Sequence, residues 1–264
     1  MQPKTKHTVL QTRGLSVGYF NKKGSAALCN NVDISFKKGE CTGLVGANGT
    51  GKSTLIRTLA AMQKPLRGSI LIEGKKIETL SPLHRATKIS VVLTEVPASK
   101  NLSVFELIAL GRQPYTNWLG KLSETDMQTV NAAMAETETT NLAGKKCSEL
   151  SDGQLQRVYI ARALAQGTPI IILDEPTTHL DLYHRAYIFK LLKRLAQQHG
   201  KTILFSTHEI EPALRLCDKM ILMVQGELYF DTPSKLIAAG RFDRLFPSGA
   251  VQFDAGSGRF LIGG

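Results

Sequence analysis

The segment Gly46–Ser53 constrains the fold more than any other part of this chain of 264 residues. It reads GANGTGKS and fits the pattern GxxxxGK[ST]. A short apolar strand, Cys41–Val45, is expected before it, and a helix from about Lys52 to Met62 after it. Glycines let such a loop turn tightly, so that successive backbone N–H groups point at one anion. The strand, loop and helix therefore predict a phosphate-binding loop.

Two side chains of this loop have a predicted chemical role. Lys52 would reach the β and γ phosphates of a nucleotide, and the Ser53 hydroxyl would bind Mg²⁺. The alternative is a chance match, which at average glycine usage arises in roughly one chain of this length in a hundred. The expected strand and helix around the loop lower that chance further.

A second motif ends the apolar run Ile170–Leu173 with two acidic residues, Asp174 and Glu175. Asp174 would hold Mg²⁺, and Glu175 would orient and deprotonate an attacking water. The alternative is an acidic end of a strand with no chemical role. The phosphate-binding loop makes that alternative the minor one.

The third motif is Leu150–Gln154, which reads LSDGQ and leads into a helix. Ser151 is a good helix N-cap, and on its own that structural role would explain it. The Ser151 hydroxyl and the Gly153 N–H group are also suitable donors for a second phosphate-binding helix terminus. Both interpretations can hold together.

The order of expected elements indicates an α/β fold. β-rich residues come first, strands then alternate with helices, and helices dominate from about Ser99 to Ala165 before the alternation resumes. We predict a parallel-sheet core of the P-loop NTPase type, an N-terminal antiparallel β layer and an inserted helical subdomain. The core spans about 1–95 and 167–240, the subdomain about 96–166, and a glycine-rich C-terminal extension 241–264.

Some local expectations are more specific. Gly14 is expected to separate two N-terminal strands, and Val32–Phe36 to form one strand. Ser123 is a candidate cap of the helix that contains Met127–Met134. A helix is expected to begin near Gln154.

Composition restricts the class of protein. The chain is 42% hydrophobic and 21% charged, which is ordinary for a soluble domain. Its longest uninterrupted apolar run, Met220–Val224, is far below the ~20 residues that span a bilayer. The N-terminal residues do not resemble a secretory signal, and the four cysteines are widely spaced, which fits a reducing cytosol. A net charge of +11 favours polyanions, but no dense run of Lys and Arg predicts a nucleic-acid site.

Together these motifs resemble the ATP-binding subunit of ABC transporters. The phosphate loop, the LSDGQ turn, the IIILDE strand end, the later loop Thr178–Asp181 and His208 occur in the family's order over about residues 8–240. The resemblance implies that Tyr19 stacks on adenine, although packing in the β layer would also explain it. It implies that His208 contacts the γ phosphate and that Asp181, otherwise a helix cap, serves communication between two copies.

The resemblance extends the expected site beyond the residues argued above. The residues expected to bind ATP are Tyr19, Gly46, Asn48, Gly49, Thr50, Gly51, Lys52, Ser53, Thr54, Ser151, Gly153 and Gln154. The expected catalytic residues are Glu175, His208, Lys52 and Glu95, and the expected Mg²⁺ ligands are Ser53, Asp174 and Glu95.

Two positions depart from the family pattern. Asp152 stands where the family usually has glycine in LSGGQ, and a side chain directed away from the nucleotide would preserve phosphate binding. Glu95 stands where the family has glutamine. Glutamate keeps the length and an oxygen ligand but adds a charge, so it would either bind Mg²⁺ directly or weaken nucleotide binding.

The resemblance also implies partners. Two copies would pack head to tail, with ATP between the phosphate loop of one and the Ser151 turn of the other. Separate membrane permease subunits, and indirectly a substrate-binding protein, would complete a peripheral complex at the cytoplasmic face of the membrane. The segment Leu110–Tyr115 resembles ATPases of siderophore, haem and cobalamin importers, although it would also fit a helix end. A soluble non-transport ABC ATPase, of the cofactor-assembly or DNA-maintenance type, is the alternative.

Overall fold

A six-stranded sheet forms the centre of the computed structural model, which describes residues 7–21, 24–94, 101–246 and 251–262. The strand order is β11-β10-β4-β9-β8-β7, and neighbours are parallel except β10 and β11. The strands are β4 (Cys41–Gly46), β7 (Ile89–Val92), β8 (Ile170–Leu173), β9 (Thr202–Ser206), β10 (Lys219–Val224) and β11 (Glu227–Asp231). The predicted parallel-sheet core is therefore confirmed.

Helices cover this sheet. Their packing against β8 explains why the sequence of that strand is apolar throughout. The helices of the core are α1 (Lys52–Leu59), α2 (Pro82–Ala86), α6 (Leu182–Gln197), α7 (Ile210–Leu216) and α8 (Pro233–Ala238). Ile170 and Ile172 join the apolar cluster that contains α1, whereas Ile171 and Leu173 join the cluster that contains α6. Successive strand residues point to opposite faces, so burial on both faces requires an unbroken apolar run. Each such side chain contributes about 1.5–3 kcal/mol on burial.

The N-terminal strands form a second, antiparallel sheet, as predicted. They are β1 (Thr8–Asn21), β2 (Gly24–Val32), β3 (Ser35–Lys37), β5 (Arg67–Ile72) and β6 (Lys75–Lys76). The expectation that Gly14 ends a strand is wrong, because β1 continues through Gly14 at a φ of 54° with shifts in its register. The single strand expected at Val32–Phe36 is also wrong. Asp33 leaves the ladder there, and its Oδ1 accepts the Gly14 N–H at 2.7 Å.

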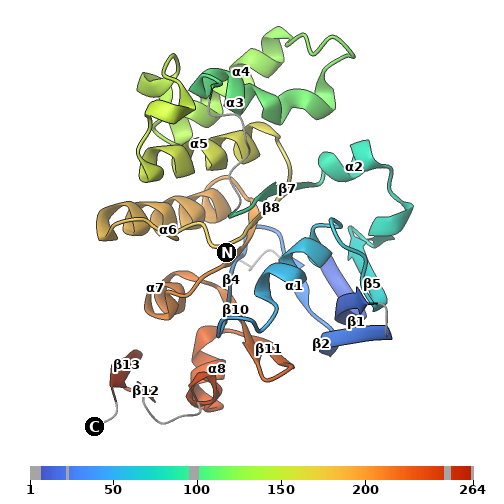
Figure 1. Cartoon of the computed structure of the whole chain (residues 1–264), viewed down its shortest axis with the longest axis vertical. Helices are drawn as coiled ribbons and strands as arrows, with labels where there is room; N and C mark the ends of the chain where they lie inside the picture. The colour runs from blue at the N-terminus through green and yellow to red at the C-terminus, as the bar shows by residue number, and fades with distance from the viewer. Residues whose placement is uncertain (1–6, 22–23, 95–100, 247–250, 263–264) are drawn as a thin grey trace, which may run out of the picture.

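Three helices beyond the edge strand β7 have an apolar cluster of their own. They are α3 (Val104–Ala109), α4 (Glu124–Glu136) and α5 (Asp152–Ala165), drawn in green to yellow in Figure 1. Ser123 caps α4 by accepting the Asp126 N–H, as predicted. The helix expected from Gln154 begins earlier, at Asp152, because Ser151 and Gln154 form a capping box across its first turn.

Short elements complete the described chain. The 3₁₀ turns are η1 (Ile77–Thr79), η2 (Leu110–Tyr115), η3 (Thr140–Leu142), η4 (Cys147–Glu149) and η5 (Asp243–Leu245). Near the C-terminus, β12 (Val251–Asp254) and β13 (Arg259–Ile262) pair in a hairpin. Phe253 of this hairpin stacks on Phe242 with ring centroids 4.9 Å apart and also contacts the Phe260 ring.

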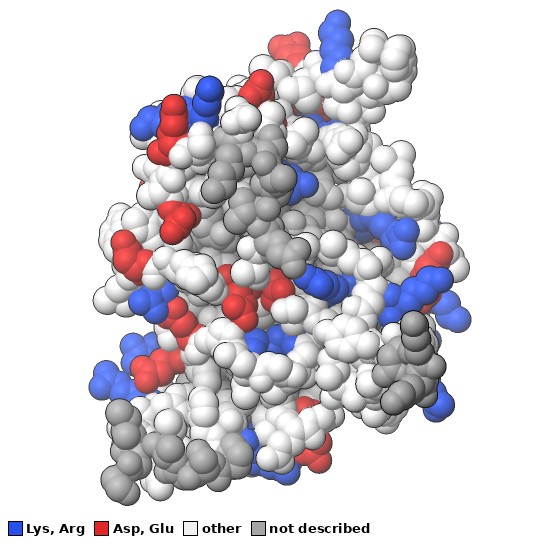
Figure 2. Space-filling model, viewed as in Figure 1, with Lys and Arg blue, Asp and Glu red and all other residues white. Residues whose placement is uncertain are grey.

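The structure can be compared with two expectations from composition, which concern a nucleic-acid site and a membrane-spanning segment. On the face drawn in Figure 2, Lys and Arg side chains are interspersed with Asp and Glu, and the described residues of that face form no single extended basic patch. Within the described ranges, no helix has both the length and the apolar character that crossing a membrane requires.

A buried ion pair joins the helices beyond β7. The Arg112 Nε atom donates to Asp126 Oδ1 at 2.8 Å, and its Nη1 atom donates to the Ala165 carbonyl at 2.8 Å. Arg112 therefore connects η2 to the start of α4 and the end of α5. Hydrogen bonds from Ser123 and from Arg112 lower the pKa of the Asp126 carboxyl from its ordinary 3.8 to about 2.

This pair predicts a pH-dependent part of the stability. Because the Asp126 pKa is depressed in the folded chain, its contribution is complete above about pH 4 and is lost as the pH falls towards 2. Asp126→Asn should remove that part of the dependence of the unfolding free energy on pH. It should also reduce the unfolding free energy at pH 7 by about 3–5 kcal/mol, because it leaves Arg112 buried without its counter-ion.

Urea unfolding between pH 2 and 7 measures both effects. The matched control is Glu124→Gln, an exposed acid in the same first turn of α4. Identical pH dependence for Asp126→Asn and the wild-type chain would contradict the assignment.

Candidate functional site

The loop between β4 and α1 has an open, anion-binding geometry. Gly49 and Gly51 have φ values of 79° and 101°, in the left-handed region that favours glycine. Gly51 precedes the first turn of α1 and no side chain caps that helix. The first N–H groups of a helix have no partners within it, so this loop can present backbone donors to a ligand.

Lys52 is the buried cation of this loop. Its Nζ atom donates to the carbonyl oxygens of Gly46 at 2.9 Å and Ala47 at 3.2 Å. Burial lowers the pKa of the Lys52 amine, while the nearby carboxylates of Glu175 and Asp174 act in the opposite direction. The structure thus brings the loop and the two acids together, as the two motifs predicted separately.

A serine on the neighbouring strand positions both acids. Ser206, the last residue of β9, is completely buried, and its Oγ atom donates to Asp174 Oδ1 at 2.7 Å. The same Oγ atom accepts the Glu175 N–H at 2.8 Å. The sequence interpretation gave Ser206 no role. The available signal was a polar residue that ends an apolar strand just before His208.

Glu175 is held in one orientation by two further side chains. His208 Nε2 lies 2.7 Å from Glu175 Oε1, and the Thr178 Oγ1 atom donates to Glu175 Oε2 at 3.2 Å. The Glu175 backbone has a φ of 48°, which is unusual for a residue other than glycine. His208 is 42% exposed and Glu175 22% exposed, so both are accessible to a ligand.

The side chain of the residue before Glu95 also contacts the acid pair. Thr94 Oγ1 donates to the Asp174 carbonyl at 3.0 Å. Glu95, predicted as a catalytic residue and Mg²⁺ ligand, lies outside the described residues. Thr94 is a site residue that the sequence interpretation did not identify.

Tyr19 lies beside the first turns of α1. Its hydroxyl is hydrogen-bonded to Thr54 Oγ1, and the side chain is 52% exposed. Thr54 itself is buried. Packing of the Tyr19 ring inside the β layer, the alternative considered for it, does not fit that exposure.

Within one chain, the LSDGQ turn lies near the acid pair but apart from the phosphate-binding loop. Asp152 lines a cavity of about 120 Å³ together with Thr94, Asp174, Glu175 and Thr178. Ser151 and Gln154 close the first turn of α5 through a reciprocal pair of hydrogen bonds, of 3.3 Å and 3.1 Å. Figure 1 shows α5 apart from α1, on the other side of β7 and β8. Asp181 acts as the N-cap of α6 and accepts the His184 N–H at 2.8 Å, which is the structural role considered for it.

Comparison with known proteins agrees with this geometry. Residues 29–178 match the family model described as ABC transporter. The achromobactin transport ATP-binding protein of Dickeya dadantii (strain 3937) is 41% identical over 214 residues, which are 81% of this chain and 78% of that protein. The iron(3+)-hydroxamate import ATP-binding protein of Bacillus subtilis (strain 168) is 37% identical, covering 82% of this chain and 79% of its own length.

A solved structure supports the same grouping. The dimeric structure of a bacterial ABC transporter cassette is 29% identical with a TM-score of 0.74, over 85% of this chain and 98% of that one. The family match covers more than half of this chain, and the relatives exceed a third in identity over most of it. The chain belongs to the ABC transporter family.

Proposed function

We propose that this chain is the ATP-hydrolysing subunit of a transporter that imports an iron complex. The observation that carries the proposal is the meeting of buried Lys52 with Asp174, Glu175 and His208 at the ends of neighbouring parallel strands. Phosphoryl transfer needs these groups: a phosphate cradle, a carboxylate for Mg²⁺ and a base for water. The relatives named above serve achromobactin transport and iron(3+)-hydroxamate import, which supports the class of cargo.

The loop binds the nucleotide in this proposal. Lys52 exchanges its two carbonyl partners for β and γ phosphate oxygens, and the backbone N–H groups of the loop surround the phosphates. The exposed Tyr19 ring stacks on adenine. The other contacts are those predicted from the sequence: Gly46, Asn48, Gly49, Thr50, Gly51, Ser53 and Thr54.

The residues present fit Mg²⁺. Asp174 offers a buried carboxylate, and Ser53 offers a hydroxyl in the first turn of α1. Mg²⁺ prefers oxygen ligands and is usually held by one or two protein groups together with substrate phosphates and water. When bound, Mg²⁺ neutralises charge on the β and γ phosphates.

Glu175 accepts the proton of the attacking water. His208 and Thr178 each hold one of its carboxylate oxygens, so the group is oriented before the nucleotide arrives. His208 then lies at the γ phosphate, where it stabilises developing negative charge. Ser206 keeps Asp174 and the Glu175 backbone at a constant separation.

A second copy of the chain completes the site. Ser151, Gly153 and Gln154 bind the γ phosphate held by the partner's loop, because α5 presents an N-terminus that lies apart from the loop of its own chain. Leu182 and Tyr183, next to Asp181, are each 75% exposed. Apolar side chains exposed to this degree at the start of α6 are consistent with burial against the second copy.

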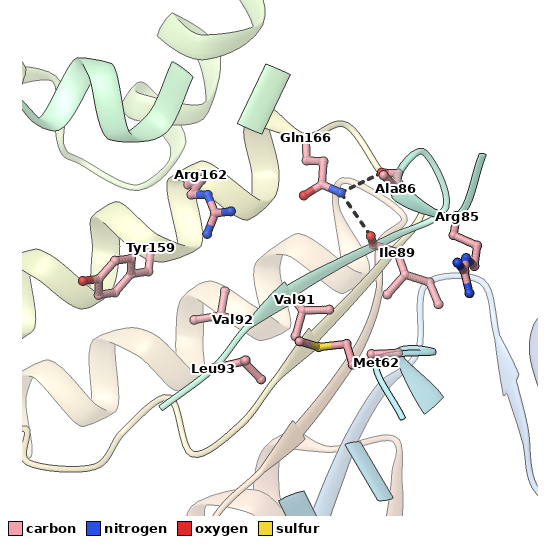
Figure 3. A pocket seen from close by; sticks show the side chains of 11 residues that line it. Met62, Arg85, Ala86, Ile89, Val91, Val92, Leu93, Tyr159, Arg162 and Gln166 are labelled. Carbon is pink, nitrogen blue, oxygen red and sulfur yellow. Dashed lines mark hydrogen bonds between the residues drawn. The ribbon is translucent and has the colours of Figure 1, made fainter. Parts of the chain in front are cut away.

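A groove beside β7 is the proposed contact for the membrane subunits. It has a volume of about 350 Å³ and lies between α2, β7 and α5, with Val92, Leu93 and Arg162 directed into it (Figure 3). The Arg162 Nε atom is buried and finds no acceptor among the described residues. Leu93 lines the groove, and the next residue, Thr94, donates a hydrogen bond to the Asp174 carbonyl. A shift of Leu93 on binding of a membrane subunit would therefore reach the acid pair through two adjacent residues. In this proposal residues 1–240 are the ATPase unit at the cytoplasmic face of the membrane, and residues 241–264 are an extension of it.

Glu175→Gln tests the base. The amide cannot accept the proton, so steady ATP hydrolysis should fall by about 10²–10⁴-fold while ATP affinity stays within about twofold. The variant should accumulate as an ATP-bound dimer in size-exclusion chromatography. Wild-type turnover by Glu175→Gln would remove this residue as the base.

Ser206→Ala tests the positioning of the acids. It removes a buried hydrogen bond to a carboxylate, worth about 1.5–3 kcal/mol, so kcat should fall roughly 10- to 150-fold. Ser206→Thr, which keeps a hydroxyl, should retain more activity. The control is Ser90→Ala, which removes a buried serine bonded to Thr168. Equal activities for the Ser206→Ala and Ser90→Ala variants would refute the role.

Arg162→Glu tests the groove. Reversing a half-buried charge there should reduce the recovery of membrane subunits that copurify with the wild-type chain by about tenfold, because the docked segment loses the guanidinium donor and meets a carboxylate in its place. Lys235→Glu, an exposed change on α8, is the control for altered net charge. Full recovery with Arg162→Glu would place the membrane contact elsewhere.

A further inference from the structure

The ring of His184 joins the LSDGQ turn to the start of α6. His184 is in the first turn of α6, where its Nδ1 atom lies 2.8 Å from Asp181 Oδ1. The same oxygen accepts the His184 N–H at 2.8 Å, so Asp181 caps the helix and orients the imidazole at once. Because the carboxylate is an acceptor, Nδ1 carries the proton and Nε2 is at the far side of the ring. The Tyr183 ring meets the imidazole edge-on, with centroids 5.4 Å apart.

The far side of this ring lies directly over Gly153. A Cβ atom at position 153 would come within 2.2 Å of His184 Cδ2, 2.5 Å of Cγ and 2.8 Å of Nε2. Its three nearest neighbours would therefore all belong to one imidazole. Gly153 is buried, and its φ is outside the left-handed region. Close approach of a ring, rather than backbone conformation, is what requires glycine here.

This contact joins α5 to α6. The apolar side chains of α5 divide between the cluster of the helices beyond β7, to which Val158 belongs, and the core cluster, to which Ile160 belongs, whereas those of α6 lie in the core cluster. The imidazole is only 28% exposed, and Asp181 bonds it on the edge remote from Gly153. A rigid ring held at both ends transmits the position of one element to the other.

We infer that His184 is a positioning residue that holds the LSDGQ turn and the Asp181 loop together as one surface. The inference rests on the proposed function, in which that surface faces the nucleotide of the second copy. With the ring in place, the Gly153 N–H group and Asp181 reach the partner in a constant relative orientation. Without the ring, the LSDGQ turn shifts relative to the Asp181 loop. The Gly153 N–H group and Asp181 then less often face the partner's nucleotide together.

A thermal-unfolding cycle tests the contact itself. In the wild-type chain, Gly153→Ala should lower the melting temperature, because the new methyl group collides with the imidazole. In a His184→Ala chain the same change should raise it by about 2–4 °C, because the space is vacant and alanine is the better helix former. A decrease of equal size in both backgrounds would show that the ring does not occupy this position.

ATPase kinetics of the full chain test the positioning role. His184→Ala should lower kcat by about tenfold, since misplaced groups cost rate, and leave KM for ATP within about twofold, since the loop of the same chain binds the nucleotide. His184→Asn, which restores a donor for Asp181, should recover part of the loss. The matched control is His84→Ala, an exposed histidine at the equivalent position of α2, where Ser81 is the cap.

The outcomes separate this inference from the proposed function. An unchanged kcat for His184→Ala, or a raised KM with kcat preserved, overturns the positioning role. A wild-type chain that does not hydrolyse ATP overturns the proposed function instead, and the unfolding cycle still decides whether the contact exists.

Discussion

The attraction between one buried ammonium group and two carboxylates organises this molecule. Lys52 begins α1, after the loop that follows β4. Asp174 and Glu175 follow the end of β8, and only β9 separates β4 from β8 in the sheet. A buried cation without counter-charges would be costly, and burial alone lowers the pKa of Lys52. The carboxylates of Glu175 and Asp174 act against this effect of burial. In the proposed function, a triphosphate that enters between them meets the Lys52 cation at its oxygens, with the carboxylates placed for its metal and its water.

The parallel sheet brings these groups together from distant parts of the sequence. Strands that run in one direction end at one edge, so their following residues share one crevice. Ser206 shows the precision that results, because one hydroxyl of β9 bonds the side chain of Asp174 and the backbone of Glu175. Thr94, after β7, bonds the same acid. β9 and the segment after β7 thus both hold Asp174, so a change at Ser206 or Thr94 reaches this acid.

The features that depend on residues close together in the sequence could be predicted. The glycine-rich loop, the isoleucine run of β8 and the cap at Ser123 follow from spacing and residue type. Contacts between distant segments have no such signature. Ser206 is one polar residue at a strand end, and the ring of His184 meets Gly153 only after both helices have packed. Gly14 misled the prediction because a positive φ can serve a bulge within a strand as well as its end.

In the proposed function, neither chain alone has a complete reaction centre, because the LSDGQ turn lies apart from the phosphate-binding loop of its own chain. The most direct measurement is ATP turnover per chain over a wide range of protein concentration, at saturating ATP and Mg²⁺. The account predicts a per-chain rate that rises with concentration and reaches a plateau as dimers form. A per-chain rate that stays constant down to concentrations at which sedimentation shows only monomers would contradict it.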